Sequence, residues 1–258
     1  DPVSRRIIMF GGFRTPSALN DTWAWDGQRW QQVFPANVPG VREGAATGTT
    51  RFRDTDPTAT DYLYLQGGYA PLLPYRDLWR WDGSNWILLE SGPQHPPGES
   101  YLEDLVWWPN TQSLTLLTAE NTGAGELWSW DGNQWSQDSV FPFKDPNNGI
   151  VGRSGSAYDP VSGHLLFHGW DADGDNDPSE TWSWDGIQWS LLSQTGTPRL
   201  PSRMETHLGT NTVVCMSEPR VTHGWQAGQW TELERFEWPM NGIIHNAVHH
   251  PYIDRSYF

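Results

Sequence analysis

The chain has 258 residues, 36% of them hydrophobic and 14% aromatic, so it is long enough to bury a substantial core. Its 16 basic and 31 acidic residues give a net charge of −15, which argues against binding to the phosphates of nucleic acid and leaves cationic, metal or neutral ligands open. No stretch approaches about 18 consecutive apolar residues, so no membrane span is expected, and a single cysteine, Cys215, excludes an intrachain disulfide framework.

The first predicted elements are an apolar strand and an aromatic hairpin. The run RIIMFGG at Arg6 has the composition of a strand. In the segment DTWAWDGQRW that follows, alternation places Trp23 and Trp25 on one face of a second strand. The Asp-Gly pair at Gly27 predicts a tight reversal, because glycine accepts the positive φ that hairpin turns require, and Trp30 begins the returning strand.

This aromatic hairpin is an internal repeat. It recurs as DLWRWDGSNW, ELWSWDGNQW and ETWSWDGIQW, with a degenerate fifth copy, HGWQAGQW. The second tryptophan of each copy is Trp25, Trp81, Trp130, Trp184 or Trp225. Their spacings of 56, 49, 54 and 41 residues are close to the period of propeller blades, in which each small sheet stacks on its neighbours.

Each repeat is predicted to hold four strands, named A, B, C and D in chain order. Strands C and D form the aromatic hairpin, and an apolar strand B precedes them. Strand A is expected before strand B at residues 44–52, 101–108, 155–158, 204–209 and 243–249. The sequence therefore predicts an all-β fold, a β-propeller of four-stranded antiparallel blades, in a single domain over residues 1–258.

The two ends of the chain bear on the number of blades. The opening DPVSRRIIMFGG matches DPVSGHLLFHGW from Asp159, so the chain begins just after a strand A. Residues 243–250 resemble a strand A with no hairpin after it, which predicts five blades closed by pairing of the C-terminal strand with the N-terminal strands. The final PYIDRSYF, however, resembles the next A–B turn and the start of another strand B. Part of a six- or seven-bladed propeller is the alternative.

The Gly-Gly after strand B, at Gly11-Gly12 and Gly67-Gly68, together with the aromatic strand C and the tryptophan that opens strand D, resembles the kelch repeat in its WDG-rich bacterial form. The resemblance covers almost the whole chain, although the double glycine is replaced in the three later units. It implies a propeller whose inter-strand loops bind partners, and it implies no single activity.

The loops between strands B and C and between strands D and A are long, differ between units, and leave the same face of an antiparallel blade. Variable loops on a rigid scaffold are typical of recognition surfaces. Aromatic residues in these loops that packing does not require, together with neighbouring charged residues, are the predicted ligand contacts: Phe13, Arg14, Tyr69, Tyr75, Arg76, Glu120, Trp170 and Arg220.

One loop concentrates hard oxygen ligands of the kind that Ca²⁺ prefers. In WDADGDNDPSE the acidic residues alternate as Asp171, Asp173, Asp175 and Asp177. This pattern resembles the start of an EF-hand loop, but Asn176 occupies the usual glycine position and Trp182 the twelfth position. A calcium site of structural type and an ordinary solvated loop are the two interpretations.

Arginines near the start of several A strands are Arg42, Arg153 and Arg203. Kelch-like propellers often carry a basic residue there, near the central channel. One interpretation is structural ion pairing, with Glu43 and Glu205 as the expected partners, and the other is an anion site at the channel mouth.

Known catalytic patterns fit the chain poorly. The galactose-oxidase family combines a kelch-type propeller with copper held by two tyrosines and two histidines, but strand alternation here sends His249 and His250 to opposite faces. No GxSxG, HExxH or phosphate-binding glycine loop is present.

The sequence thus favours a non-catalytic module that recognises a protein or polysaccharide ligand through its B–C and D–A loops, as part of a larger chain or complex. The alternative is a carbohydrate-active enzyme or a lectin-like propeller. Because the chain begins with Asp1 rather than Met, we expect export to an extracellular or periplasmic location.

Overall fold

The computed structural model of the chain describes residues 1–51, 58–70, 73–90, 96, 104–118, 125–141, 152–170, 180–194, 198, 203–207, 209–217, 221–235, 248–250 and 255–257. All regular elements among these residues are β-strands, and the main strands form five antiparallel sheets. The chain divides into two compact units, unit 1 with residues 1–121 and 125–140 and unit 2 with residues 122–124 and 141–258. The described residues include no helix that could cross a membrane.

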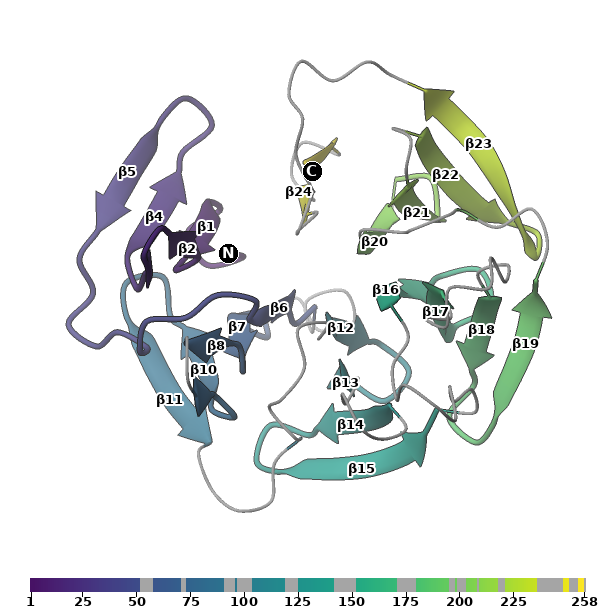
Figure 1. Ribbon diagram of the computed structural model, residues 1–258, viewed down its shortest axis with the longest axis horizontal. Helices are drawn as coiled ribbons and strands as arrows, with labels where there is room; N and C mark the ends of the chain where they lie inside the picture. Colours follow the sequence, from purple (N-terminus) through teal and green to yellow (C-terminus); the bar gives the residue numbers. More distant parts are fainter. Residues whose placement is uncertain are drawn as a thin grey trace. The chain divides into compact units, whose positions relative to one another are not determined.

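Unit 1 contains three sheets whose strands follow the predicted order (Figure 1). Sheet 1 consists of β1 (Ile7–Phe10), β4 (Thr22–Trp25) and β5 (Trp30–Val33). Sheet 2 consists of β6 (Ala46–Thr49), β7 (Leu63–Gln66), β10 (Leu78–Trp81) and β11 (Trp86–Glu90). Sheet 3 consists of β12 (Asp104–Trp108), β13 (Ser113–Thr118), β14 (Glu126–Trp130) and β15 (Trp135–Val140). The A strands of sheets 2 and 3, β6 and β12, contact each other.

Unit 2 contains two further sheets and a short hairpin. Sheet 4 consists of β16 (Gly152–Asp159), β17 (His164–Trp170), β18 (Glu180–Trp184) and β19 (Trp189–Ser193). Sheet 5 consists of β20 (Arg203–His207), β21 (Thr212–Ser217), β22 (Val221–Gln226) and β23 (Gln229–Arg235). The hairpin pairs β24 (Val248–His250) with β25 (Arg255–Tyr257). Strand β20 contacts both β16 and β24, so the A strands of this unit lie side by side.

The fold class predicted from the sequence, an all-β chain with five propeller blades, is confirmed. Strand β25 is the strand expected after the last A–B turn: His250 pairs with Arg255, with the same five-residue offset as Asp159 with His164. Sheet 1 has three described strands, with β1 bonded to β4. The completion of sheet 1 by residues 243–250 stays a prediction, because residues 243–247 lie outside the described part of the chain. The single domain over residues 1–258 also stays a prediction.

The N-terminal turn confirms the match between the two DPVS segments. The Asp1 carboxylate accepts hydrogen bonds from the backbone N–H groups of Val3 and Ser4. The Asp159 carboxylate accepts the same bonds from Val161 and Ser162. The aspartate of the DPVS segment therefore closes the turn before strand B in the same way in both sheets.

Each WDG turn brings two tryptophans together across the C–D hairpin. In all five sheets the last tryptophan of strand C is in register with the tryptophan of strand D, as Trp25 is with Trp30. The ring centroids of these pairs are 5.1 to 5.7 Å apart. The turn aspartate accepts two backbone N–H groups, which lowers the pKa of Asp26, Asp131 and Asp185. The turn thus sets the indole geometry that the core uses.

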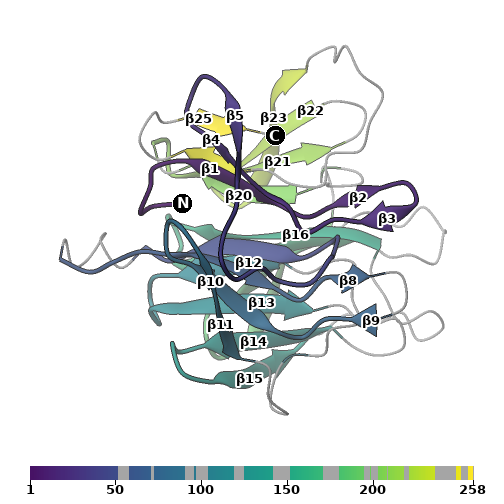
Figure 2. The ribbon, with the colours of Figure 1, turned by 90° about the vertical axis from the view of Figure 1, so that its left-hand side faces the viewer.

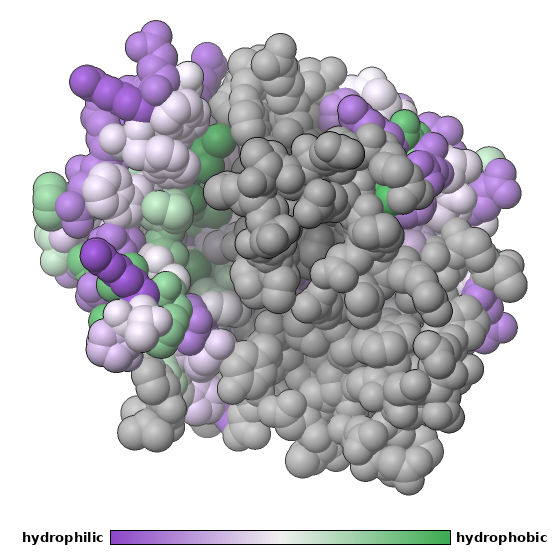
Figure 3. Space-filling model, turned by 45° about the horizontal axis from the view of Figure 1, so that its top comes forward, coloured by the Kyte–Doolittle hydropathy of each residue, from purple (hydrophilic) through white to green (hydrophobic). Residues whose placement is uncertain are grey.

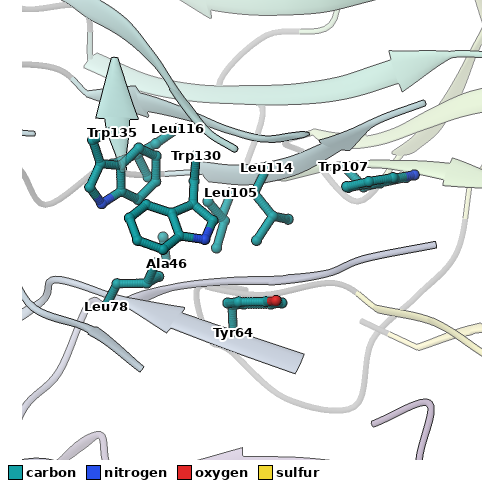
Figure 4. Packing of buried hydrophobic residues seen from close by; sticks show 9 residues of the cluster. All are labelled: Ala46, Tyr64, Leu78, Leu105, Trp107, Leu114, Leu116, Trp130 and Trp135. Atoms are coloured by element: carbon teal, nitrogen blue, oxygen red, sulfur yellow. The ribbon is translucent and has the colours of Figure 1, made fainter. Parts of the chain in front are cut away.

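In sheets 2, 3 and 5 both indoles of the pair are buried, whereas Trp30 of sheet 1 is 44% exposed. Figure 4 shows Trp130 and Trp135 of sheet 3 packed with leucines of sheets 2 and 3. The buried cluster consists of Ala46, Tyr64, Leu78, Leu105, Trp107, Leu114, Leu116, Trp130 and Trp135. In unit 2 the corresponding cluster includes Cys215, which is fully buried and packs as a small hydrophobic core residue, and burial raises the pKa of its thiol.

A buried hydrogen-bond chain joins the two sheets of unit 2. The Trp230 indole N–H donates to Thr181 Oγ1 (2.8 Å), and the His168 ring contacts Thr181 Oγ1 through Nδ1 and the Pro198 carbonyl through Nε2, both at 2.9 Å. Since a carbonyl oxygen only accepts, Nε2 carries the proton and Nδ1 of the neutral ring accepts from Thr181. Burial lowers the pKa of His168 to about 4.

This histidine predicts a specific loss of stability in acid. The unfolded chain takes up a proton near pH 6.5, whereas the folded chain does so only near pH 4, so stability falls as the pH falls through that interval. We expect a loss of about 2 kcal/mol in the free energy of unfolding between pH 7 and pH 5. Urea unfolding at both values should show a smaller loss in His168→Gln, because glutamine does not titrate. An equal loss in both proteins would contradict the assignment.

Candidate functional site

The B–C loops of sheets 1 and 2 are themselves short hairpins. In sheet 1 the loop contains β2 (Phe13–Arg14) paired with β3 (Ser17–Ala18), and in sheet 2 it contains β8 (Tyr69–Ala70) paired with β9 (Leu73–Pro74). Figure 2 shows both hairpins extending beyond the same end of their sheets. The loop face predicted from the sequence therefore has a regular backbone in unit 1.

Two consecutive residues of the D–A connection bind both hairpins at their bases. The backbone N–H of Arg42 donates to Leu19 O, and Arg42 O accepts from Gly12 N–H, each at 2.9 Å. The next residue, Glu43, exchanges both backbone hydrogen bonds with Tyr69, at 2.9 and 3.0 Å. We call the described residues of 11–19, 42–43 and 67–77 the hairpin platform. Its backbone is a continuous hydrogen-bonded layer.

The double glycines allow this close approach. A Cβ on Gly11 would lie 2.6 Å from the Arg42 carbonyl oxygen, and one on Gly68 would lie 2.8 Å from the Glu43 carbonyl oxygen. Both residues also have positive φ, +65° and +84°. Glycine at these positions therefore allows the backbone of the D–A connection to pack against the B–C loops.

The Arg42 side chain contacts several residues of the platform and holds them together. Its guanidinium forms a bidentate ion pair with Asp77, with Nη1–Oδ1 at 2.6 Å and Nη2–Oδ2 at 2.9 Å. It also donates to the carbonyls of Gly67 (2.8 Å) and Gly40 (3.1 Å), and its Cζ lies 3.9 Å from the centre of the Tyr75 ring. Arg42 is only 1% exposed, so its charge is held by the protein itself.

The partner of Arg42 is Asp77, not Glu43 as the sequence suggested. Asp77 belongs to a pattern that the repeat displays but that motif reasoning missed: an acidic residue two positions before the first tryptophan of strand C. Asp77 accepts the Trp79 indole N–H at 2.6 Å, and Asp21, Glu126 and Glu180 do the same for Trp23, Trp128 and Trp182 at 2.6 to 2.8 Å. The i, i+2 spacing puts the acid and the indole on one face of the strand.

The outer surface of the platform is formed by different residues. Phe13 is 49% exposed, and Arg14 and Arg76 are exposed. Tyr69 and Tyr75 are half-buried, Tyr75 against Arg42 and Tyr69 beside Gly44, where a Cβ would lie 2.9 Å from the Tyr69 ring. Among the predicted contacts in unit 1 that the structure describes, Phe13, Arg14 and Arg76 are thus the most accessible side chains.

The exposed carboxylates of unit 1 lie elsewhere. In its described part they are Asp26 and Asp131, in C–D turns, and Asp138 on β15. The C–D turns are at the opposite end of each sheet from the B–C loops, because consecutive strands are antiparallel. The exposed charged side chains of the platform, among its described residues, are both arginines. Figure 3 shows hydrophilic and hydrophobic residues interspersed on the described surface in that view.

Several predicted site residues remain untested. Glu120, Arg220 and the calcium candidates Asp171, Asp173, Asp175 and Asp177 lie outside the described residues. Trp170, Arg153 and Arg203 fall on strands β17, β16 and β20, but their side chains are not described. The described part of the chain holds no group of three or more His, Cys, Asp or Glu residues that would suit a metal ion.

Solved structures with a similar fold include two lectins and a nidogen/laminin complex. The structure of SapL1 lectin in complex with alpha methyl fucoside has a TM-score of 0.55 and 16% identity, over 87% of this chain and 74% of that chain. The fucose-specific lectin from Aleuria aurantia has a TM-score of 0.53 and 13% identity, over 89% and 79%. The nidogen/laminin complex has a TM-score of 0.52 and 15% identity, over 90% and 79%.

At these identities the likeness shows the fold alone. No family model matches the chain. No curated protein matches it in sequence. The kelch resemblance therefore stays a prediction.

Proposed function

We propose that the chain is a non-catalytic binding module that recognises a protein or polymer ligand through its B–C and D–A loops, with the hairpin platform as the contact surface in unit 1. The observation that carries the proposal is the backbone layer that joins both hairpins through Arg42 and Glu43. A loop surface ordered before binding loses little conformational entropy when the ligand arrives.

The accessible side chains suit recognition. Aromatic and arginine side chains are enriched among residues that dominate binding energy, and Phe13 with Arg14 places both types at adjacent positions on one hairpin. Of the predicted contacts, Tyr75 supports the platform by stacking on Arg42. Tyr69 supports it through its backbone pairing with Glu43.

A lectin-like role is the second candidate. A sugar ring can stack on the exposed Phe13 ring while its hydroxyl groups accept hydrogen bonds from the adjacent Arg14. Two of the structures with a similar fold are lectins by their descriptions. A glycosidase would need two carboxylates facing a cleft. On the platform, Asp77 is engaged by Arg42 and Trp79, which favours binding over catalysis at this surface. Location outside the cytoplasm and membership of a larger assembly stay predictions.

We expect Phe13→Ala to weaken ligand binding about tenfold, or about 1.4 kcal/mol, because aromatic side chains are enriched among the residues that dominate binding energy. The measurement is retention of the labelled chain on arrays of purified polysaccharides and immobilised proteins, followed by titration of the best target. Ile187→Ala is the matched control, because Ile187 is 87% exposed in a C–D turn. Equal binding by all three proteins would contradict the platform as the contact surface.

A further inference from the structure

His168 lies in the contact between sheets 4 and 5 of unit 2. It follows Leu166 by two positions on β17, so both side chains face the buried cluster that includes Trp230 of sheet 5. The His168 ring is fully buried, and its centroid is 5.3 Å from that of the Trp230 ring. Its Nε2 also binds the carbonyl of Pro198, in the D–A connection, at 2.9 Å. One side chain thus joins two sheets and a connection of the loop face.

The sheets of unit 1 carry residues that do not titrate at the same position. His168 is in register with Thr181, the residue before the first tryptophan of strand C. The corresponding residues of sheets 1, 2 and 3 are Phe10, Gln66 and Leu117. Of the eight histidines in the sequence, only His95 belongs to unit 1, and it lies outside the described residues. A change from pH 7 to pH 5 therefore acts mainly on unit 2.

Protonation of the His168 ring places two donors against each other. In the neutral ring Nδ1 accepts from the Thr181 hydroxyl, whose oxygen accepts from the Trp230 indole N–H. A proton taken up from solvent at Nδ1 makes this nitrogen a donor, so the Thr181 hydroxyl loses its acceptor. The positive charge is also buried away from water, which adds a desolvation cost. Separation of the two sheets removes both penalties.

The titratable groups nearest the ring do not compensate this charge. A charge on His223 of β22 repels it, and Cys215, in register with His223, is a neutral thiol because burial raises its pKa. The carbonyls of Pro198 and Glu180 favour the charged ring, but burial outweighs them and lowers the pKa of His168 to about 4.

Two carboxylates of the neighbouring strands are directed elsewhere. Glu180 precedes Thr181 on β18, so its side chain points to the other face of the strand, where it accepts the Trp182 indole N–H. Glu232, in register with His223 on the outer strand β23, is exposed to solvent. Neither carboxylate offers the buried ring a counter-ion.

We propose that His168 is an acid-sensitive switch: protonation at Nδ1 opens the contact between sheets 4 and 5 and releases the D–A connection at Pro198, while the sheets of unit 1 stay packed. This inference goes beyond the proposed function and does not depend on it, because it concerns how the loop face of unit 2 is held. The pKa of the ring is about 6.5 when solvated and about 4 when buried, so opening becomes easier as the pH falls between these values. Between pH 7 and pH 5 the opening equilibrium should rise roughly twentyfold.

The test measures amide hydrogen exchange of the whole chain at pH 7 and pH 5, both above the range in which most carboxylates titrate. After correction for intrinsic exchange rates, protection of β18 and β22 should fall roughly twentyfold, whereas protection of β13 and β14 in unit 1 should fall less than about threefold. His168→Gln, which introduces the residue that sheet 2 has at this position, should remove the fall in unit 2. His164→Gln, at a half-buried histidine of the same strand, should keep it.

Three results of this experiment would overturn the inference. An equal fall in both units would show that acid opens the fold as a whole. An unchanged fall in His168→Gln would assign the effect to another group, and constant protection in wild type would show that the contact does not open. If His168→Gln does not fold, NMR titration of the wild-type histidine rings decides. One ring that stays neutral at pH 5 supports the switch, and protonation of every ring near pH 6.5 rejects it.

Discussion

Arg42→Ala is expected to lower the free energy of unfolding by about 3–5 kcal/mol, the usual effect of removing one partner from a buried ion pair. The substitution leaves the Asp77 carboxylate without its counter-ion and the carbonyls of Gly67 and Gly40 without their donor. It also removes the cation that stacks on Tyr75. Urea unfolding monitored by tryptophan fluorescence measures the effect.

Three further variants separate the causes. Arg42→Lys keeps the charge but not the bidentate geometry, so we expect an intermediate loss. In the double variant Arg42→Ala/Asp77→Ala the losses should be less than additive, because the two residues share one interaction. Arg14→Ala, at an exposed arginine of the same platform, should change stability by less than about 0.5 kcal/mol. An Arg42→Ala midpoint equal to that of wild type would show that the ion pair is not a support of the fold.

The sequence predicts the register of the aromatic hairpins but not the ion-pair partner of Arg42. The register of the aromatic hairpins follows from local chemistry, since the turn at WDG connects strands C and D and puts Trp25 opposite Trp30. The partner of Arg42 does not follow, because Asp77 is 35 positions away and the two meet only when the D–A connection crosses the loop of the next sheet. Adjacent Glu43 is the nearest acidic residue in the sequence, but residues 42 and 43 pair with neighbouring chain segments as extended backbone, in which consecutive side chains point to opposite sides.

The hairpins of the platform were not predicted from the sequence, because their strands are too short. Strands β2, β3, β8 and β9 are two residues long, too short for hydrophobic alternation to be visible. The loops were correctly placed between strands B and C, and their accessible residue Phe13 was identified because packing does not require it. The distinction between a supporting aromatic, Tyr75, and an exposed one, Phe13, needs the position of Arg42.

Trp86→Ala is expected to destabilise the fold by about 3–5 kcal/mol, as for other large aromatic residues truncated in a core. Trp86 is 1% exposed and packs against Phe10 and Trp81, with ring centroids 5.3 and 5.1 Å away. Its indole N–H donates to Thr22 Oγ1 of the neighbouring sheet at 3.1 Å. Truncation removes packing and a hydrogen bond between sheets 1 and 2 at once.

The same position in sheet 3 provides the matched comparison. Trp135 occupies the place of Trp86, but the residue corresponding to Thr22 is Leu78, and the Trp135 indole N–H has no hydrogen-bond partner among the described residues. Trp86→Phe should therefore cost about 1–2 kcal/mol more than Trp135→Phe, because only the former breaks a buried hydrogen bond. Thr22→Val should leave the Trp86 indole unpaired and cost a similar amount.

A double-mutant cycle between Trp86→Phe and Thr22→Val decides whether that hydrogen bond couples the sheets. With both partners replaced by apolar groups, the loss should be smaller than the sum of the single losses, since neither a donor nor an acceptor is left unpaired. The same bond recurs in unit 2, from Trp230 to Thr181. This recurrence indicates that a threonine at the start of strand C accepts a hydrogen bond from the indole of the next sheet. Additive losses in the cycle, or equal losses for Trp86→Phe and Trp135→Phe, would mean that shape complementarity alone joins the sheets.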